Sequence, residues 1–91
     1  MQRPNIKDID AAIRVFYGNG YVSNTEIREI FGVKSDASIA RIKKPVLEEE
    51  VRLGVPRVVP FCLNTKVAFE VWGIDVPELV KSRDERMRLG L

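Results

Sequence analysis

The chain has 91 residues, 15 basic and 13 acidic side chains, and no histidine. This length predicts a single domain over residues 1–91 with one modest core. The absence of histidine removes the commonest general base and metal ligand, and no glycine-rich phosphate loop or carboxylate cluster is present, so we expect neither an enzyme nor a metal or cofactor site.

The same composition bears on location. No apolar run reaches the length of a transmembrane helix, and the first ten residues lack the apolar segment of a signal peptide. We therefore expect a cytoplasmic protein with no membrane contact. Cys62 is the only cysteine, which excludes an internal disulfide, and its apolar neighbours in 58–63 favour a structural thiol over a reactive one.

An apolar stripe at helical spacing predicts the first helix. Its members are Ile6, Ile9, Ile13, Phe16 and Tyr17. Asn5 can cap this helix, and Asp8 would then lie where a carboxylate favours the positive end of the helix dipole. Glycines at 18 and 20 predict a tight reversal after it. We expect this helix to pack across the next two, as in a three-helix bundle.

Residues 22–32 carry the start and stop signals of a second helix. Ser23 and Glu26 form a capping box, and Val22 and Ile27 occupy the positions of a hydrophobic staple. Gly32 follows the last apolar residue, and glycine enters the left-handed conformation that ends helices at the least cost.

A third helix is predicted over 36–44, with Ser35 as its N-cap. Two isoleucines three residues apart, Ile39 and Ile42, would face the core. The opposite face at 100° per residue holds Ala37, Ala40, Arg41 and Lys44. Pro45 lacks an amide hydrogen and clashes with the preceding turn, so we expect the helix to end near Lys44.

The distribution of charge singles out this third helix. The formal net charge is only +2. Residues 1–47 hold eight basic and five acidic side chains, or +3, whereas residues 48–91 hold seven and eight, or −1. The short segment 34–44 alone has four basic and one acidic side chain, again +3. A local basic patch is what phosphate contact requires, although a solvated helix face can also be basic.

The segment 22–44 resembles the helix-turn-helix DNA-binding superfamily. The matching positions are Ile27, Phe31, Gly32, Val33, Ile39 and Ile42. Arg28 stands where the superfamily usually has a small residue, and the turn would have four residues rather than three. An ordinary helical hairpin has the same apolar pattern.

The resemblance implies a small transcriptional regulator of bacterial or phage type that binds double-stranded DNA, with the helix 36–44 in the major groove. The expected base contacts are Ala37, Ser38, Arg41 and Lys44. The expected phosphate contacts are Lys34, Ser35, Lys43 and Arg57. One such domain binds modestly, so a homodimer on two half-sites is also expected.

The second half of the chain predicts further helices. Residues 45–53 read as a short helix with Val46, Leu47, Val51 and Leu53 as apolar positions, and its three consecutive glutamates read as a solvated face. Residues 55–63 contain Pro56 and Pro60, which favour an irregular strap; the alternative is a wing, an edge strand paired with 50–53 and tipped by Arg57.

Two more helices complete the pattern. Asn64 or Thr65 can cap a helix that ends at Gly73 and carries Trp72 as a core anchor. Asp75 begins an amphipathic C-terminal helix at about 76–89, which has too few apolar residues to be buried along its length. The sequence thus predicts a mainly α fold, a small bundle of about five helices built around a helix-turn-helix.

A second function is compatible with these features. The apolar stretch 58–72 and the C-terminal helix also suit a protein-interaction or assembly module, for example a subunit of a phage or mobile-element complex that does not read DNA. A stable oligomer without salt-sensitive DNA affinity would distinguish it.

Overall fold

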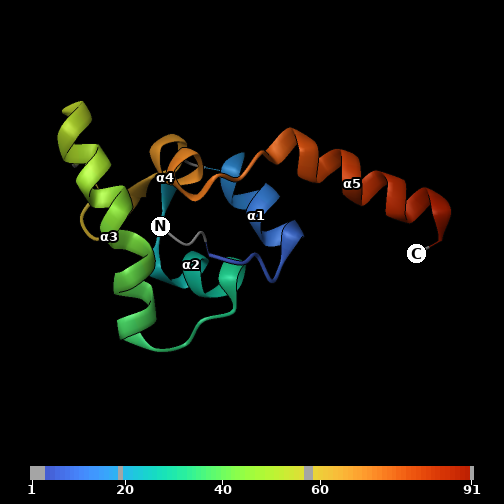
Figure 1. The fold of residues 1–91 in the computed structure, drawn as a ribbon, viewed down its shortest axis with the longest axis horizontal. Coiled ribbons are helices and arrows are strands. Elements are labelled where there is room, and N and C mark those ends of the chain that lie inside the picture. The colour runs from blue at the N-terminus through green and yellow to red at the C-terminus, as the bar shows by residue number, and fades with distance from the viewer. Residues whose placement is uncertain (1–3, 19, 57–58, 91) are drawn as a thin grey trace.

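The computed structural model describes residues 4–18, 20–56 and 59–90 of the chain. The described part is mainly helical, as predicted, with a small antiparallel sheet in which Tyr21 pairs with Asn64 and Val22 with Leu63 (Figure 1). The elements in chain order are α1 (Ile9–Phe16), β1 (Tyr21–Val22), α2 (Asn24–Phe31), α3 (Asp36–Leu53), β2 (Leu63–Asn64), α4 (Thr65–Trp72) and α5 (Val76–Leu89). None of the described helices has both the length and the apolar character needed to cross a bilayer.

The first helix begins later than the sequence suggested. Asp8, rather than Asn5, is the N-cap of α1, and its carboxylate accepts from the Ala11 amide at 2.9 Å. The reason lies in α2, since the Ile30 carbonyl accepts from the amides of both Lys7 and Asp8, at 2.7 and 3.1 Å. These bonds hold the segment before α1 in a non-helical conformation against the end of α2.

The buried face of α1 also differs from the predicted stripe. Ala11, Ala12 and Val15 are its most buried residues, whereas Tyr17 is largely exposed. The helix packs on α2, α4 and α5. Small alanines allow this close packing on several neighbours, and they are not conspicuous in a search for large apolar residues.

The capping signals of α2 are confirmed. The Ser23 hydroxyl accepts from the Glu26 amide at 3.2 Å, and the Glu26 carboxylate accepts from the Ser23 amide at 2.9 Å. Val22 and Ile27 are both fully buried. Gly32 has φ of 66° and ends the helix, and the turn to α3 has the four residues, 32–35, that the spacing predicted.

The third helix does not end at Pro45 but continues for two further turns as one helix, α3. Pro45 cannot donate to the Arg41 carbonyl, and a proline inside a helix costs about 3 kcal/mol. Tertiary contacts offset this cost. Val46 is completely buried, and the Trp72 indole N–H donates to the Ile42 carbonyl at 3.2 Å, beside the interrupted turn.

Continuity through Pro45 changes which residues of the second half of α3 face inward. The inward positions are Ile39, Val46 and Glu50, which are spaced seven and four apart. Glu50 is therefore buried, where a solvated face was predicted, and its carboxylate accepts from the Asn64 amide of β2 at 2.7 Å. Val51 and Leu53, predicted as apolar inner positions, are instead exposed.

The wing that was the alternative for residues 55–63, paired with 50–53, does not form. Residues 50–53 are helical and so cannot pair with 55–63. The strand that forms, β2, pairs with β1 next to α2, and the Thr65 amide also donates to the Gly20 carbonyl at 3.0 Å. Residues 59–61 form a bend and turn that leads into β2, which fits the predicted irregular strap.

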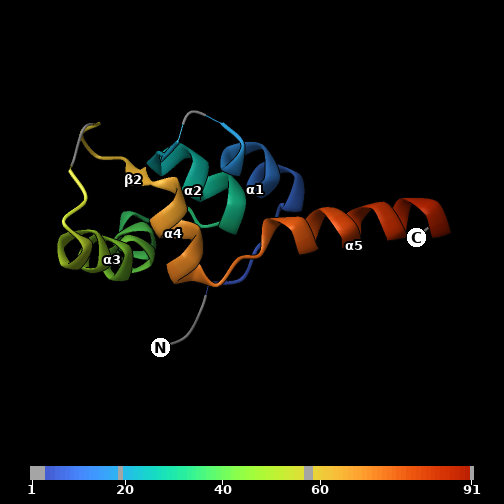
Figure 2. The ribbon, with the colours of Figure 1, turned by 90° about the horizontal axis from the view of Figure 1, so that it is seen from above.

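The last two helices play different roles. Asn64 caps α4, which carries the fully buried Phe69 and Trp72 into the core, and the Trp72 ring meets Phe31 edge-on at 4.9 Å between centroids. By contrast α5 is buried only at its start, at Val76, and leads away from the other helices (Figures 1 and 2). Its departure accounts for the long dimension of the molecule, 43 Å against 26 and 24 Å.

The role of Glu50 can be tested by denaturation. Glu50→Ala is expected to lower the free energy of unfolding by about 2 kcal/mol, because the Asn64 amide loses a charged acceptor. Glu48→Ala is the matched control, since Glu48 is exposed on the same helix and should change stability by less than about 0.5 kcal/mol. Urea titration followed by Trp72 fluorescence measures both, and equal effects would contradict the assignment.

Candidate nucleic-acid interface

The outward side of α3 is the candidate interface. Opposite its buried positions the helix presents an outer stripe of four residues, Ala37, Arg41, Lys44 and Glu48, all of which are exposed. Three of them are predicted base contacts, and the structure brings them onto one face as expected. Ala40 lies beside the stripe and is also exposed. Along the outer stripe, the small Ala37 is followed by the basic Arg41 and Lys44, and the acidic Glu48 comes last.

The side of α3 opposite the outer stripe is anchored in the core. Ile39 and Val46 are buried against the core, and the α4 helix is the main neighbour of α3. The N-terminus of α3 is fixed by Ser35, whose hydroxyl oxygen accepts from the Ser38 amide at 3.1 Å, as predicted for an N-cap. A rigid helix loses little conformational entropy when it contacts a partner.

Several basic side chains elsewhere on the molecule are engaged in ion pairs, although Lys66, Lys81, Arg86 and Arg88 have no ion pair among the described residues. Three arginines join different elements through carboxylates, in the pairs Arg14–Glu29, Arg28–Asp36 and Arg83–Asp10. Around the outer stripe the pattern is reversed. Lys7, Lys34, Arg41 and Lys44 are all exposed and make no ion pair or side-chain hydrogen bond with another described residue. They are the free basic cluster, and their donors are available to an external anion.

Lys43 was predicted as a phosphate contact, but the structure assigns it to the fold. Its ammonium group donates to the Asn24 side-chain oxygen and to the Phe61 carbonyl, both at 3.0 Å. It thereby connects α3 to the start of α2 and to the turn before β2. Lys43 lies about 100° around the helix from Lys44, its neighbour in sequence, and its donors are used within the fold, so we leave it out of the free basic cluster.

The remaining predicted contacts fall into two groups. Ser35 and Ser38 lie together at the start of α3, where the Ser35 hydroxyl donates to the Ser38 hydroxyl oxygen at 2.9 Å, so part of their bonding capacity is used within the helix cap. Ser38 is half-buried and Ser35 exposed. Arg57 lies outside the described residues.

The unusual Arg28 has a structural explanation. Its guanidinium contacts the Asp36 carboxylate at 3.2 Å, which connects α2 to the first turn of α3. Among the described residues, the Asp36 carboxylate has no other ion-pair partner for its negative charge. A small residue at this position would leave that charge without a partner, so Arg28 and Asp36 act as a pair.

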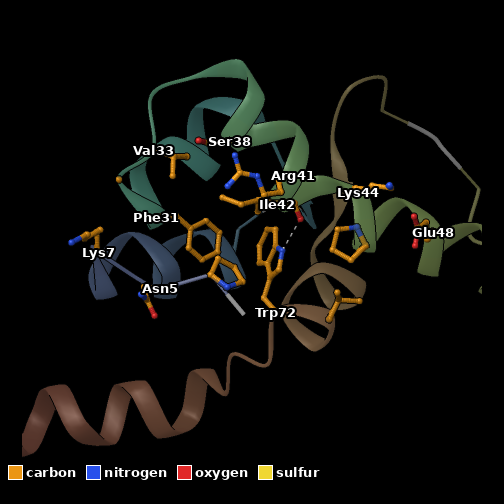
Figure 3. Close-up of a pocket in the computed structure, with 14 residues that line it drawn as sticks. Asn5, Lys7, Phe31, Val33, Ser38, Arg41, Ile42, Lys44, Glu48 and Trp72 are labelled. Atoms are coloured by element: carbon orange, nitrogen blue, oxygen red, sulfur yellow. Dashed lines mark hydrogen bonds between the residues drawn. The ribbon is translucent and has the colours of Figure 1, made fainter. Parts of the chain in front are cut away.

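A groove borders the outer stripe on one side (Figure 3). It has a volume of about 980 Å³ and runs between α3, the C-terminal end of α4 and the segment before α1. Arg41, Lys44 and Lys7 line it, together with the apolar residues Val33 and Ile42. Three of the four residues of the free basic cluster therefore border one concave surface.

Two residues of this site were not recognised from the sequence. Lys7 reaches the groove because its backbone is bonded to Ile30 and its aliphatic stem covers Gly32, where an added Cβ would lie 2.7 Å from the Lys7 Cγ. No local pattern in the sequence predicts the contact between Lys7 and Gly32, which are 25 positions apart. Glu48 belongs to the outer stripe only because α3 continues through Pro45.

Comparison of the chain with protein-family models, with curated proteins and with solved structures gave no match. Function is therefore inferred from the residues of this chain. Within residues 4–18, 20–56 and 59–90, no group of three cysteine or carboxylate side chains is placed to hold a metal ion.

The different roles of two adjacent lysines give a testable contrast. Lys43→Ala is expected to lower the free energy of unfolding by about 1 kcal/mol, because it removes two hydrogen bonds from a charged donor. Lys44→Ala should change it by less than about 0.5 kcal/mol, since Lys44 is exposed and unpaired. Thermal or urea unfolding distinguishes them, and a larger loss for Lys44→Ala would refute the assignment.

Proposed function

We propose that this protein binds double-stranded DNA as a small transcriptional regulator of bacterial or phage type, acting in the cytoplasm, with α2 and α3 as a helix-turn-helix. The observation that carries the proposal is the outer stripe of α3, on which Arg41 and Lys44 are exposed and have no partner among the described residues, while the other side of the helix is anchored in the core. A helix presented in this way has the width that the major groove admits.

The first half of the outer stripe suits base edges. Ala37 and Ala40 are small and exposed, so they permit close approach to the floor of the groove and to thymine methyl groups. Arg41 can donate two hydrogen bonds to the O6 and N7 atoms of guanine, which discriminates by roughly 1–3 kcal/mol. Ser38 can contact either base type. Glu48 repels phosphate at the other end and so limits the reading segment to the N-terminal part of α3.

The flanking cations suit the DNA backbone. Lys34 lies in the turn before α3, and Lys7, in the segment before α1, covers Gly32 at the start of that turn. We add Lys7 to the phosphate contacts and retain Ser35 beside Lys34. Arg57, outside the described residues, remains a proposed contact from the sequence alone.

A homodimer is part of the proposal because one domain of this size offers few contacts. Two copies on half-sites about one DNA turn apart would double the number of base contacts. The α5 helix, which leads away from the other helices, is the element best placed to reach a second copy (Figure 2).

Salt dependence tests the DNA proposal directly. On a random-sequence duplex, Arg41 and Lys44 can pair with phosphates as the two flanking lysines do, so about four phosphates are neutralised. The logarithm of the binding constant should then fall with the logarithm of salt concentration with a slope of about −3 to −4 per protomer. Fluorescence anisotropy of a labelled random-sequence duplex, between roughly 50 and 200 mM salt, measures this slope.

Matched variants locate the contact. Arg41→Ala and Lys44→Ala should each weaken binding and reduce the slope by about one. Arg88→Ala removes an exposed, unpaired arginine near the end of α5 and should leave the slope unchanged. Absence of binding at the lower salt concentration, or equal losses in all three variants, would contradict the proposed interface.

An assembly module is the second candidate, and one observation favours it. Exposed apolar side chains occur away from the outer stripe, with Val51 77% and Phe61 80% exposed. Large exposed apolar groups are common at protein interfaces. Light scattering that gives a defined oligomer, combined with no salt-sensitive DNA affinity, would support this candidate over DNA binding.

A further inference from the structure

The groove beside α3 has features that DNA binding does not use. Its walls include Val33 from the turn after α2, Ile42 and Pro45 from α3, and Val71 from α4. Apolar side chains of this kind contribute nothing to the binding of a phosphate or a sugar. The volume of about 980 Å³ is at the upper end of the range of small-molecule sites.

The charges at the rim favour an anion. Lys7, Arg41 and Lys44 contribute three positive charges, and Glu48 contributes one negative charge at one end. None of these four groups has an ion-pair partner among the described residues. In Figure 3 the Arg41 side chain lies above the apolar floor formed by Phe31 and Trp72. An apolar wall beside unpaired cations suits a ligand that combines an apolar body with a negative group.

We propose that this groove binds a small organic anion with an aromatic or branched apolar body, such as an aromatic carboxylate. The body lies against Val33, Ile42 and Val71, and the carboxylate pairs with Arg41 and Lys44. Arginine is well suited to this role because its planar guanidinium matches a carboxylate in two parallel hydrogen bonds.

Occupancy of the groove has a regulatory consequence, which rests on the proposed function. Arg41 and Lys44 belong both to the outer stripe and to the rim of the groove. A carboxylate held by them removes the same donors that DNA would use. The two ligands therefore compete, and the anion acts as an effector that releases DNA.

The only tryptophan of the chain provides a specific probe of the groove. Trp72 lines the groove, its indole N–H donates to the Ile42 carbonyl at 3.2 Å, and it gives a single indole signal in a proton–nitrogen correlation spectrum. Titration of the full chain with 2-naphthoate should shift this signal saturably. The control ligands are acetate, which has the charge without the body, and 2-naphthol, which has the body without the charge.

Substitutions at the rim of the groove test whether 2-naphthoate binds there. The double variant Arg41→Gln, Lys44→Gln should weaken 2-naphthoate binding about tenfold, since each exposed pair contributes up to about 1 kcal/mol. Val33→Thr keeps the shape of the wall but adds a hydroxyl, and should weaken binding about threefold. Arg88→Gln on α5 should have no effect.

The outcomes separate this proposal from the DNA proposal. A saturable, charge-dependent shift that the double variant weakens supports the ligand site, whether or not the chain binds DNA. No saturable shift, equal affinity for 2-naphthol, or an unchanged double variant overturns the site. Where the chain does bind DNA, 2-naphthoate should raise the apparent dissociation constant of the labelled duplex in proportion to its occupancy, and an unchanged constant overturns the competition.

Discussion

The architecture depends on the passage of α3 through Pro45 as one continuous helix. A proline in a helix interior removes a hydrogen bond and strains the preceding turn, so the helix persists only because both of its halves are anchored. Val46 is buried directly after the proline, Glu50 is bonded to β2, and the Trp72 indole donates to the Ile42 carbonyl. This anchorage sets the face that α3 turns outward and places Pro45 and Trp72 in the groove beside it.

Some basic side chains of the molecule have partners within the fold, and others have none among the described residues. Arginines that join α1, α2, α3 and α5 have carboxylate partners, and Lys43 is bonded to a side-chain oxygen and a carbonyl. Exposed pairs of this kind contribute little to stability, but they occupy cations that would otherwise bind anions elsewhere. The free basic cluster places three unpaired cations along one groove, an arrangement that the mild net charge of the chain does not reveal.

Local signals in the sequence were reliable where no distant contact opposed them. The caps at Ser23 and Ser35 and the stop at Gly32 were predicted correctly, because each involves residues within a few positions of one another. The break at Pro45 and the exposure of Glu50 were predicted wrongly, because burial against α4 and β2 outweighs the local preference. The pairing of β1 with β2, more than 40 residues apart, has no local signal at all.

The candidate site shows the same division. Rotation of the helix at 100° per residue placed Ala37, Arg41 and Lys44 on one exposed face, and that geometry needs no tertiary information.

Protection of lysines from acetylation tests the central claim most directly, since it reports which surface a duplex covers. With saturating duplex DNA, Lys34 and Lys44 should be protected while Lys66 and Lys81 remain reactive. Uniform reactivity of all four, or protection confined to Lys81 on α5, would contradict DNA contact through α3.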